Sequence, residues 1–154
     1  MGGRLGPRRA LKEPRTRKRR TLTYAGLKKR ADRVFSDWIR CSAASGPMEC
    51  ATCITCGAVH KWTLLQCGHF ISRVHLSTRY DERNCAPQCY ACNVLRRGTP
   101  GEFALYLQRR YGPNIIAELV EKKRISVKLG RGDLESLIET YQEKLDQLGS
   151  SKER

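Results

Sequence analysis

Two C-x2-C motifs, at Cys53 and Cys56 and again at Cys89 and Cys92, constrain this chain more than any other feature. Each motif forms a short knuckle, and two knuckles bring four thiolates around one tetrahedral ion, the usual arrangement of structural zinc. An ion held in this way fixes both ends of the loop between the motifs. The spacing therefore predicts a zinc-bound core over residues 50–98.

The remaining cysteines and the N-terminus indicate where such a chain is expected to work. The N-terminal segment is charged and lacks the apolar stretch of a signal peptide. No run approaches the ~20 apolar residues of a membrane span. These features favour a reducing, cytoplasmic compartment over a disulfide framework. Four of the eight cysteines lack paired spacing and are interpreted as buried free thiols rather than as ligands of a second zinc: Cys41, Cys50, Cys67 and Cys85.

The charge of the chain points to a polyanionic partner. The 154 residues include 30 Lys and Arg but only 15 Asp and Glu, a formal net charge of +15. Such an excess favours nucleic acid as the partner. Nine basic residues fall within residues 1–20, where Glu13 is the only acid and no apolar periodicity occurs. We interpret this segment as a disordered basic arm that contacts phosphates.

Apolar periodicity predicts helices on both sides of the core. Residues 24–41 carry an apolar stripe at helical spacing, with Thr21 or Thr23 available as the N-cap. A second helical region is expected over residues 101–148. Its helices are predicted at 102–111, at 114–123 and from a cap at Asp133 to residue 148, followed by a polar tail at 149–154.

Inside the core the pattern is short and irregular. A strand is predicted over residues 62–67, leading into His69, and a second over residues 84–86, just before the second knuckle. Residues 90–97 are expected to open a helix. Strand, loop, strand and helix around one metal-bearing face predict a single α+β domain over residues 21–148.

Three polar side chains in this core suit phosphodiester hydrolysis. The reaction needs a water deprotonated near pH 7, and imidazole titrates there, so His69 is the candidate general base. It also needs a divalent cation, Mg²⁺ or Mn²⁺, on the scissile phosphate. Hard cations prefer oxygen ligands, and Asn93 supplies one directly after the last zinc cysteine. The amide of Asn84 is suited to brace the loop that carries His69.

Several arginines surround these three side chains in the sequence. A guanidinium group matches the geometry of a phosphate with paired N–H donors. Solvated surface charge is the alternative for some of them. We expect DNA contacts from this group, which consists of Arg73, Arg79, Arg83, Arg96 and Arg97.

Taken together, the motifs resemble a known family, the NinG (Rap) recombination endonucleases of lambdoid phages. They are also similar to the wider His-Asn-His (ββα-metal) endonuclease fold, including the zinc-clamped phage resolvase endonuclease VII. The resemblance covers about residues 50–148. The motifs that carry it are Cys53-x2-Cys56-Gly57, Gly68-His69-Phe70, Arg79-Tyr-Asp-Glu-Arg-Asn84 and Gln88-Cys89-x2-Cys92-Asn93.

The resemblance implies a nuclease for branched DNA, such as Holliday junctions and D-loops, in the cytoplasm of a phage-infected host. It places His69 as the general base, Asn84 as the central Asn and Asn93 as a ligand of the catalytic ion. Two symmetric cuts across a junction would suit a homodimer. The sequence departs from the family at Gly68, where many of these nucleases carry an Asp or His as a second ligand. The candidates for that ligand are Asp81, Glu82, His75 or a water.

The alternative function is a non-catalytic zinc module that binds nucleic acid, for instance a regulator. The pairing of His69 with Asn93 distinguishes the two hypotheses. A pure binder needs neither a general base nor an oxygen ligand for a catalytic cation.

The basic arm yields a prediction about DNA binding. Deleting residues 1–20 should weaken binding to all DNA sequences alike, because phosphate contacts carry no sequence information. Each lost contact should also remove about 0.9 from the slope of log affinity against log salt. A salt titration of the full chain and the truncated chain measures this slope, and an unchanged slope would show that the arm does not touch DNA.

Overall fold

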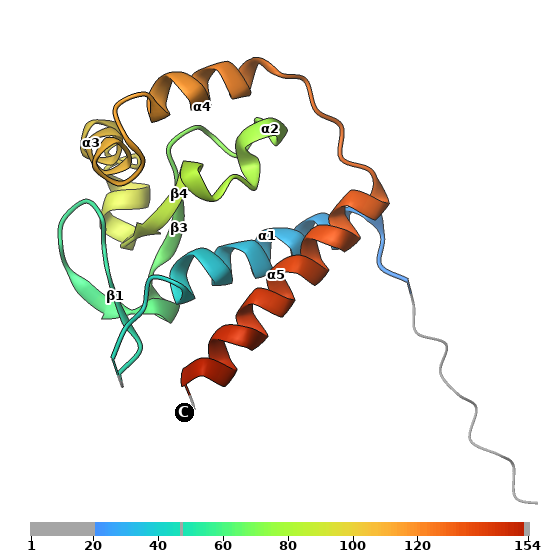
Figure 1. Ribbon diagram of the computed structural model, residues 1–154, viewed down its shortest axis with the longest axis horizontal. Helices are drawn as coiled ribbons and strands as arrows, with labels where there is room; N and C mark the ends of the chain where they lie inside the picture. Colours follow the sequence, from blue (N-terminus) through green and yellow to red (C-terminus); the bar gives the residue numbers. More distant parts are fainter. Residues whose placement is uncertain (1–20, 47, 153–154) are drawn as a thin grey trace, which may run out of the picture.

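The computed structural model describes residues 21–46 and 48–152, so the arm predicted for residues 1–20 lies outside the described residues. Helices and two small antiparallel sheets alternate along the chain (Figure 1). This mixture confirms the predicted α+β content. The main elements are α1 (Tyr24–Cys41), β1 (Cys50–Thr52), β2 (Val59–Lys61), β3 (Gln66–His69), α2 (Leu76–Arg79), β4 (Cys85–Gln88), α3 (Pro100–Tyr111), α4 (Ile115–Arg124) and α5 (Arg131–Lys152).

Three single-turn elements complete the core. Two are 3₁₀ turns, η1 (Trp62–Leu64) and η2 (Glu82–Asn84), and the third, η3 (Ala91–Leu95), is a π-helical turn. None of the helices in the described part of the chain is long and apolar enough to cross a lipid bilayer.

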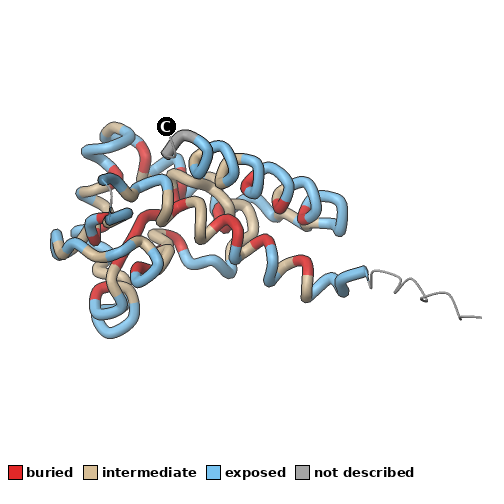
Figure 2. The backbone as a smooth tube through the Cα atoms, turned by 90° about the horizontal axis from the view of Figure 1, so that it is seen from below, coloured by how far each residue is buried: buried red, intermediate tan, exposed pale blue. Residues whose placement is uncertain are grey.

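Helices α1 and α5 lie side by side and form one wall of the molecule (Figure 1). They run in the same direction, because Tyr24 near the start of α1 donates to the carbonyl of Leu129 just before α5, and Trp38 near its end contacts Lys144. Thr23 caps α1, as the sequence predicted, by accepting from the amide of Gly26. Buried positions recur along the inner side of both helices, and their outer sides are exposed (Figure 2).

The hairpin of β3 and β4 separates two apolar cores. Successive strand residues point to opposite faces, so Cys85 joins the core under α1 and α5 while Ala86 joins a second core under α3 and α4. The registry pairs His69 with Cys85 and Gly68 with Ala86. His69 therefore faces α1, where its ring lies 6.5 Å from that of Phe35.

A neighbouring side chain on β4 leaves room only for glycine at position 68. A Cβ at this position would lie 2.1 Å from Oε1 of Gln88, which is fully buried. Gln88 cannot swing away easily, because its amide nitrogen donates to Thr55 and to the carbonyl of Gly98. The side chain of Gln88 thus fills the space that an acid at position 68 would need.

Some local expectations differ from the structure. The strand predicted at residues 62–67 is a 3₁₀ turn followed by β3, and the β1–β2 hairpin around the first knuckle was not predicted. The π-helical turn η3 lies inside the helix expected at residues 90–97. Helix α5 begins at Arg131 and continues through Lys152, beyond the end expected at residue 148. Asp133 lies in its first turn and accepts from the amide of Gly130, as the acid of a capping box does.

The contact at Gly68 yields a prediction about stability. Gly68→Ala should destabilise the zinc-loaded protein by about 1–3 kcal/mol, the usual range for overpacking a tight core. Gly101→Ala is the matched control, because nothing lies within 4 Å of its Cβ position in the first turn of α3. Chemical denaturation of both variants measures the difference. Equal stability of the two variants would show that Gln88 can move aside.

Candidate active site and metal centre

The four cysteines of the two knuckles converge on one point. Their sulfur atoms all lie within 4.8 Å of one another, and the sulfurs of Cys56 and Cys89 are 3.8 Å apart. Zn–S bonds of about 2.3 Å in a tetrahedron give a sulfur separation of about 3.8 Å. The cluster can therefore hold a metal such as zinc, with Cys53 and Cys92 as the remaining ligands.

Local backbone geometry builds this cluster. The turn between β1 and β2 is closed by the amide of Gly57, which donates to the carbonyl of Cys53, and Gly57 has a positive φ of 73° that favours glycine. The second knuckle leads into η3, where the amide of Asn93 donates to the carbonyl of Cys89. Asn93 is thus placed by the same turn that presents the last two thiols.

The charge balance of the cluster also favours a cation. Burial alone would raise the pKa of Cys53, but hydrogen bonds from the backbone at Cys56 and Cys89 outweigh it and lower the pKa to about 6. Burial and the neighbouring thiols raise the pKa of Cys92 to about 12. The thiol of Cys53 therefore loses its proton more readily than usual and that of Cys92 less readily, and a bound cation would favour the thiolate form of both.

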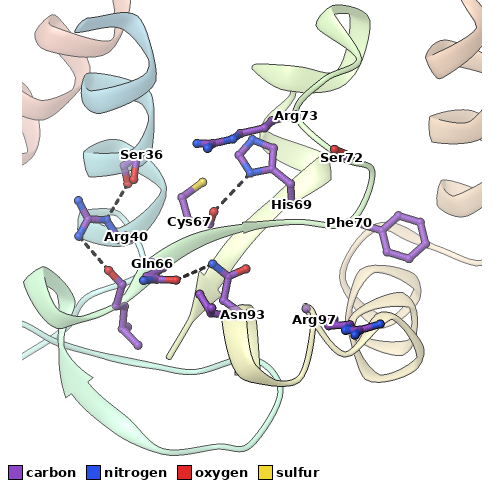
Figure 3. Close-up of a pocket in the computed structure, with 13 residues that line it drawn as sticks. Ser36, Arg40, Gln66, Cys67, His69, Phe70, Ser72, Arg73, Asn93 and Arg97 are labelled. Atoms are coloured by element: carbon purple, nitrogen blue, oxygen red, sulfur yellow. Dashed lines mark hydrogen bonds between the residues drawn. The ribbon is translucent and has the colours of Figure 1, made fainter. Parts of the chain in front are cut away.

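A cleft of about 760 Å³ opens between α1, β3 and η3 (Figure 3). His69 and Asn93 both line it, from opposite sides of the β3 ribbon, so the structure brings the candidate base and the candidate cation ligand to one cleft. Its lining includes Arg40, Arg73 and Arg97 but none of the carboxylates in the described ranges. The charged side chains of this lining are therefore all basic.

His69 is held by two backbone carbonyls. Its Nε2 lies 3.1 Å from the oxygen of Arg79, and its Nδ1 lies 3.3 Å from that of Cys67. Burial lowers the pKa of His69, and the charges of Arg79 and Arg73 lower it further, although the two carbonyls act in the opposite direction. The ring is therefore neutral near pH 7 and carries one N–H. The shorter contact favours that proton on Nε2, which leaves the lone pair on Nδ1.

Asn84 is fully buried and closes the loop after His69. Its side-chain oxygen accepts from the amide of Ile71 at 2.7 Å, and its nitrogen donates to the carbonyls of Ile71 and Thr78. The amide therefore joins both arms of the loop between β3 and β4. This is the bracing that the sequence suggested for Asn84, and it leaves no contact with the cleft.

Asn93 is oriented by Gln66, which belongs to none of the sequence motifs. Its side-chain nitrogen donates to Oε1 of Gln66 at 2.6 Å (Figure 3). Among the described residues its oxygen has no hydrogen-bond partner, so this oxygen is available to a cation. Gln66 and Gly68 alternate along β3 and therefore lie on the same face of the strand, which was a signal for a role of Gln66 near the site. The sequence did not show that η3 lies against that face.

The carboxylates considered as a second cation ligand are engaged elsewhere. Asp81 is paired with Lys122 and Arg83, and these bonds lower its pKa although burial alone would raise it. Glu82 is paired with Lys144. Neither acid lines the cleft, and His75, just before α2, does not line it either. The structure therefore brings none of the three protein candidates into the cleft.

The five arginines expected at DNA have different surroundings. Arg73 and Arg97 are exposed and line the cleft, and Arg96, which precedes Arg97 in the sequence, is exposed but is not part of the lining. Arg79 is instead buried and donates to both carboxylate oxygens of Asp32, at 2.8 and 2.6 Å. We therefore assign Arg79 to packing of the loop against α1 rather than to DNA. Arg83 is paired with two acids, Asp81 and Glu118.

Comparison with protein-family models identifies the family of this chain. A family model described as Bacteriophage Lambda NinG protein matches residues 7–152, which is nearly the whole chain. Neither a curated protein nor a solved structure matches. The matched range contains the cysteine cluster, the cleft and every helix described above.

The cysteine cluster yields a prediction about zinc. Cys89→Ser should remove one tightly bound zinc per chain and unfold the core, since structural zinc contributes about 10 kcal/mol or more to small domains. Cys50→Ser is the control, because Cys50 lies on β1 outside the cluster. Metal analysis after dialysis against a weak chelator, with thermal unfolding, measures both. A well-folded Cys89→Ser protein without zinc would contradict the structural role.

Proposed function

The chain belongs to the bacteriophage lambda NinG protein family, as its motifs suggested, and on that premise we propose that it is a metal-dependent DNA endonuclease of the His-Asn-His type. One observation carries the proposal. His69 and Asn93 line one arginine-bearing cleft, and the candidate zinc cluster adjoins it. The order β3, loop, β4 and the π-helical turn η3 supports the proposal, because a strand–strand–helix order is expected of such a core.

In the proposed reaction His69 accepts a proton from the attacking water. A neutral imidazole is needed for this step, and burial beside two arginines keeps the ring neutral at physiological pH. The carbonyl of Arg79 orients the ring through Nε2, which directs the lone pair of Nδ1 away from that contact. Asn84 acts indirectly, because it holds the loop that supplies this carbonyl.

Asn93 would hold Mg²⁺ or Mn²⁺ through its side-chain oxygen, and Gln66 would fix the direction of that oxygen. When bound, the ion supplies positive charge to the scissile phosphate and the leaving oxygen. A single amide oxygen is a weak site for a hard cation, which usually keeps several waters and binds phosphate oxygens as well. We therefore infer that the cation enters this cleft together with DNA.

DNA is the proposed partner, held by Arg73 and Arg97 in the cleft lining and by the exposed Arg96 next to Arg97 in the sequence. Family membership supports branched recombination intermediates, such as Holliday junctions and D-loops, as the preferred substrates. A homodimer would place two such clefts on one junction, and two-fold symmetry would suit paired cuts.

The test separates chemistry from binding. His69→Ala removes the proton acceptor and should lower the cleavage rate of a labelled junction by about 10²-fold or more. Junction affinity should hardly change, because phosphate contacts dominate it. Asn93→Ala should also lower the rate, but raised Mn²⁺ should recover part of it, because that variant mainly weakens cation binding. No Mn²⁺ concentration should recover His69→Ala.

His60→Ala is the matched control, since His60 lies on β2 outside the cleft lining. It should cleave like the wild type at every Mn²⁺ concentration. If His69→Ala also cleaves like the wild type, the proposed mechanism is wrong. A non-catalytic zinc module that binds nucleic acid would then be the better explanation.

A further inference from the structure

Three metal-binding side chains meet on the face of the β3–β4 hairpin that is turned toward α1. The ligand atoms of Cys67, His69 and Cys85 all lie within 4.8 Å of one another. The hairpin explains this meeting, because Cys67 and His69 alternate on one face of β3 and Cys85 pairs directly with His69. These residues are distinct from the four cysteines of the two knuckles.

We propose that Cys67, His69 and Cys85 form a second metal site, which takes a thiophilic divalent ion such as Zn²⁺. Two thiolates and one imidazole are ligands that favour Zn²⁺ over the hard cations Mg²⁺ and Mn²⁺. Three protein ligands leave the fourth position of a tetrahedral ion open. With fewer thiolates than the knuckle cluster, this site binds more weakly and fills second.

The surroundings of His69 fit a metal ligand. A ligating histidine usually donates its other ring N–H to a carbonyl or carboxylate, which fixes the ring. The carbonyl of Arg79, 3.1 Å from Nε2, provides such an acceptor. The ion would then bind at Nδ1, in place of the longer 3.3 Å contact of that nitrogen with the carbonyl of Cys67. The loop that carries this carbonyl is in turn held by Asn84.

Space for the fourth ligand lies beside the cluster. A small cavity of about 70 Å³ is lined by Cys67 and His69 together with Ser36, Asp32 and Arg73. A water molecule takes about 30 Å³, so the cavity has room for one or two waters. Its lining is polar enough to bind them, and the open position of the ion can therefore hold water or a small thiol.

Occupation of this site has a consequence for the cleft, and this step rests on the proposed nuclease function. The nitrogen of His69 that would bind the ion is the one that would accept the proton in catalysis. The two uses exclude each other, so Zn²⁺ beyond the amount held by the knuckles should inhibit cleavage while Mg²⁺ and Mn²⁺ support it. The site thereby makes the enzyme sensitive to free zinc.

The binding test uses Co²⁺ as a spectroscopic probe on the full-length protein in a reducing, metal-free buffer. The wild type should take up two equivalents per chain, each with thiolate-to-cobalt charge-transfer and tetrahedral d–d absorption. Cys67→Ser should keep the first equivalent and bind the second at least about 10-fold more weakly. Cys41→Ser is the matched control, because Cys41 belongs to neither cluster, and it should bind two.

Further variants protect the test against misfolding. Cys67 is only partly buried, so its serine variant should fold, whereas Cys85 is buried in the core and is replaced by Ala instead. His69→Ala should also lose the second equivalent. A wild type that binds one equivalent only, or a second equivalent that survives in Cys67→Ser, Cys85→Ala and His69→Ala, would overturn the proposal.

Cleavage assays then separate this site from the nuclease function. With Mn²⁺ present, added Zn²⁺ should inhibit the wild type and Cys41→Ser, and about 10-fold more Zn²⁺ should be needed for Cys67→Ser. Binding of a second Co²⁺ without any cleavage under all conditions would retain the metal site and reject the nuclease. Cleavage with only one bound Co²⁺ would retain the nuclease and reject the site.

Discussion

The pairing of β3 with β4 is the constraint on which the rest of the structure depends. Its registry, from Gln66 opposite Gln88 to His69 opposite Cys85, decides which side chains meet α1 and which meet α3. If β3 shifted by one residue relative to β4, the side chain of His69 would face the second core, under α3 and α4, and Gly68 would take its place at the cleft. The hairpin is short, so its registry needs support from outside. The cysteine cluster at one end and Asn84 in the connecting loop provide that support.

Much of the fold was predictable because the long helices follow simple periodicity. The stripe on α1 predicted its buried face, and the paired cysteines predicted a metal cluster. The short elements were not predictable in the same way. The sequence from Trp62 to Cys67 favours a strand. In the structure its first half, Trp62–Leu64, forms a 3₁₀ turn that leads into the β3–β4 hairpin. The β1–β2 hairpin has only three residues per strand, too few for a periodic signal.

The sequence predicted which residues form the site better than it predicted which other side chains they pair with. The sequence named His69, Asn84 and Asn93, and Asn84 does brace the loop. It could not separate Arg73 from Arg79, because both are arginines in one loop. Their difference is that Asp32 on α1, far away in sequence, neutralises one of them and not the other. In the same way, Lys122 and Lys144 engage the acids that seemed available to a cation. Such pairings depend on how α4 and α5 fold back over the loop.

If both proposed sites bind their ions, the arrangement of ligands around the hairpin would sort metal ions by chemistry. Sulfur ligands gather at the knuckles and on the α1 side of β3, whereas the side-chain amides of Gln66 on β3 and Asn93 on η3 are hydrogen-bonded to each other. In the proposed scheme a hard cation would bind the Asn93 oxygen at η3, and zinc would bind the thiolates at the other two places. His69 lies where the two sets of ligands meet. Burial opposes a positive charge on the imidazole ring of His69. A bound ion and a transferred proton would also compete for the same nitrogen lone pair. At this position His69 would be the residue through which bound zinc affects the proposed chemistry at the cleft.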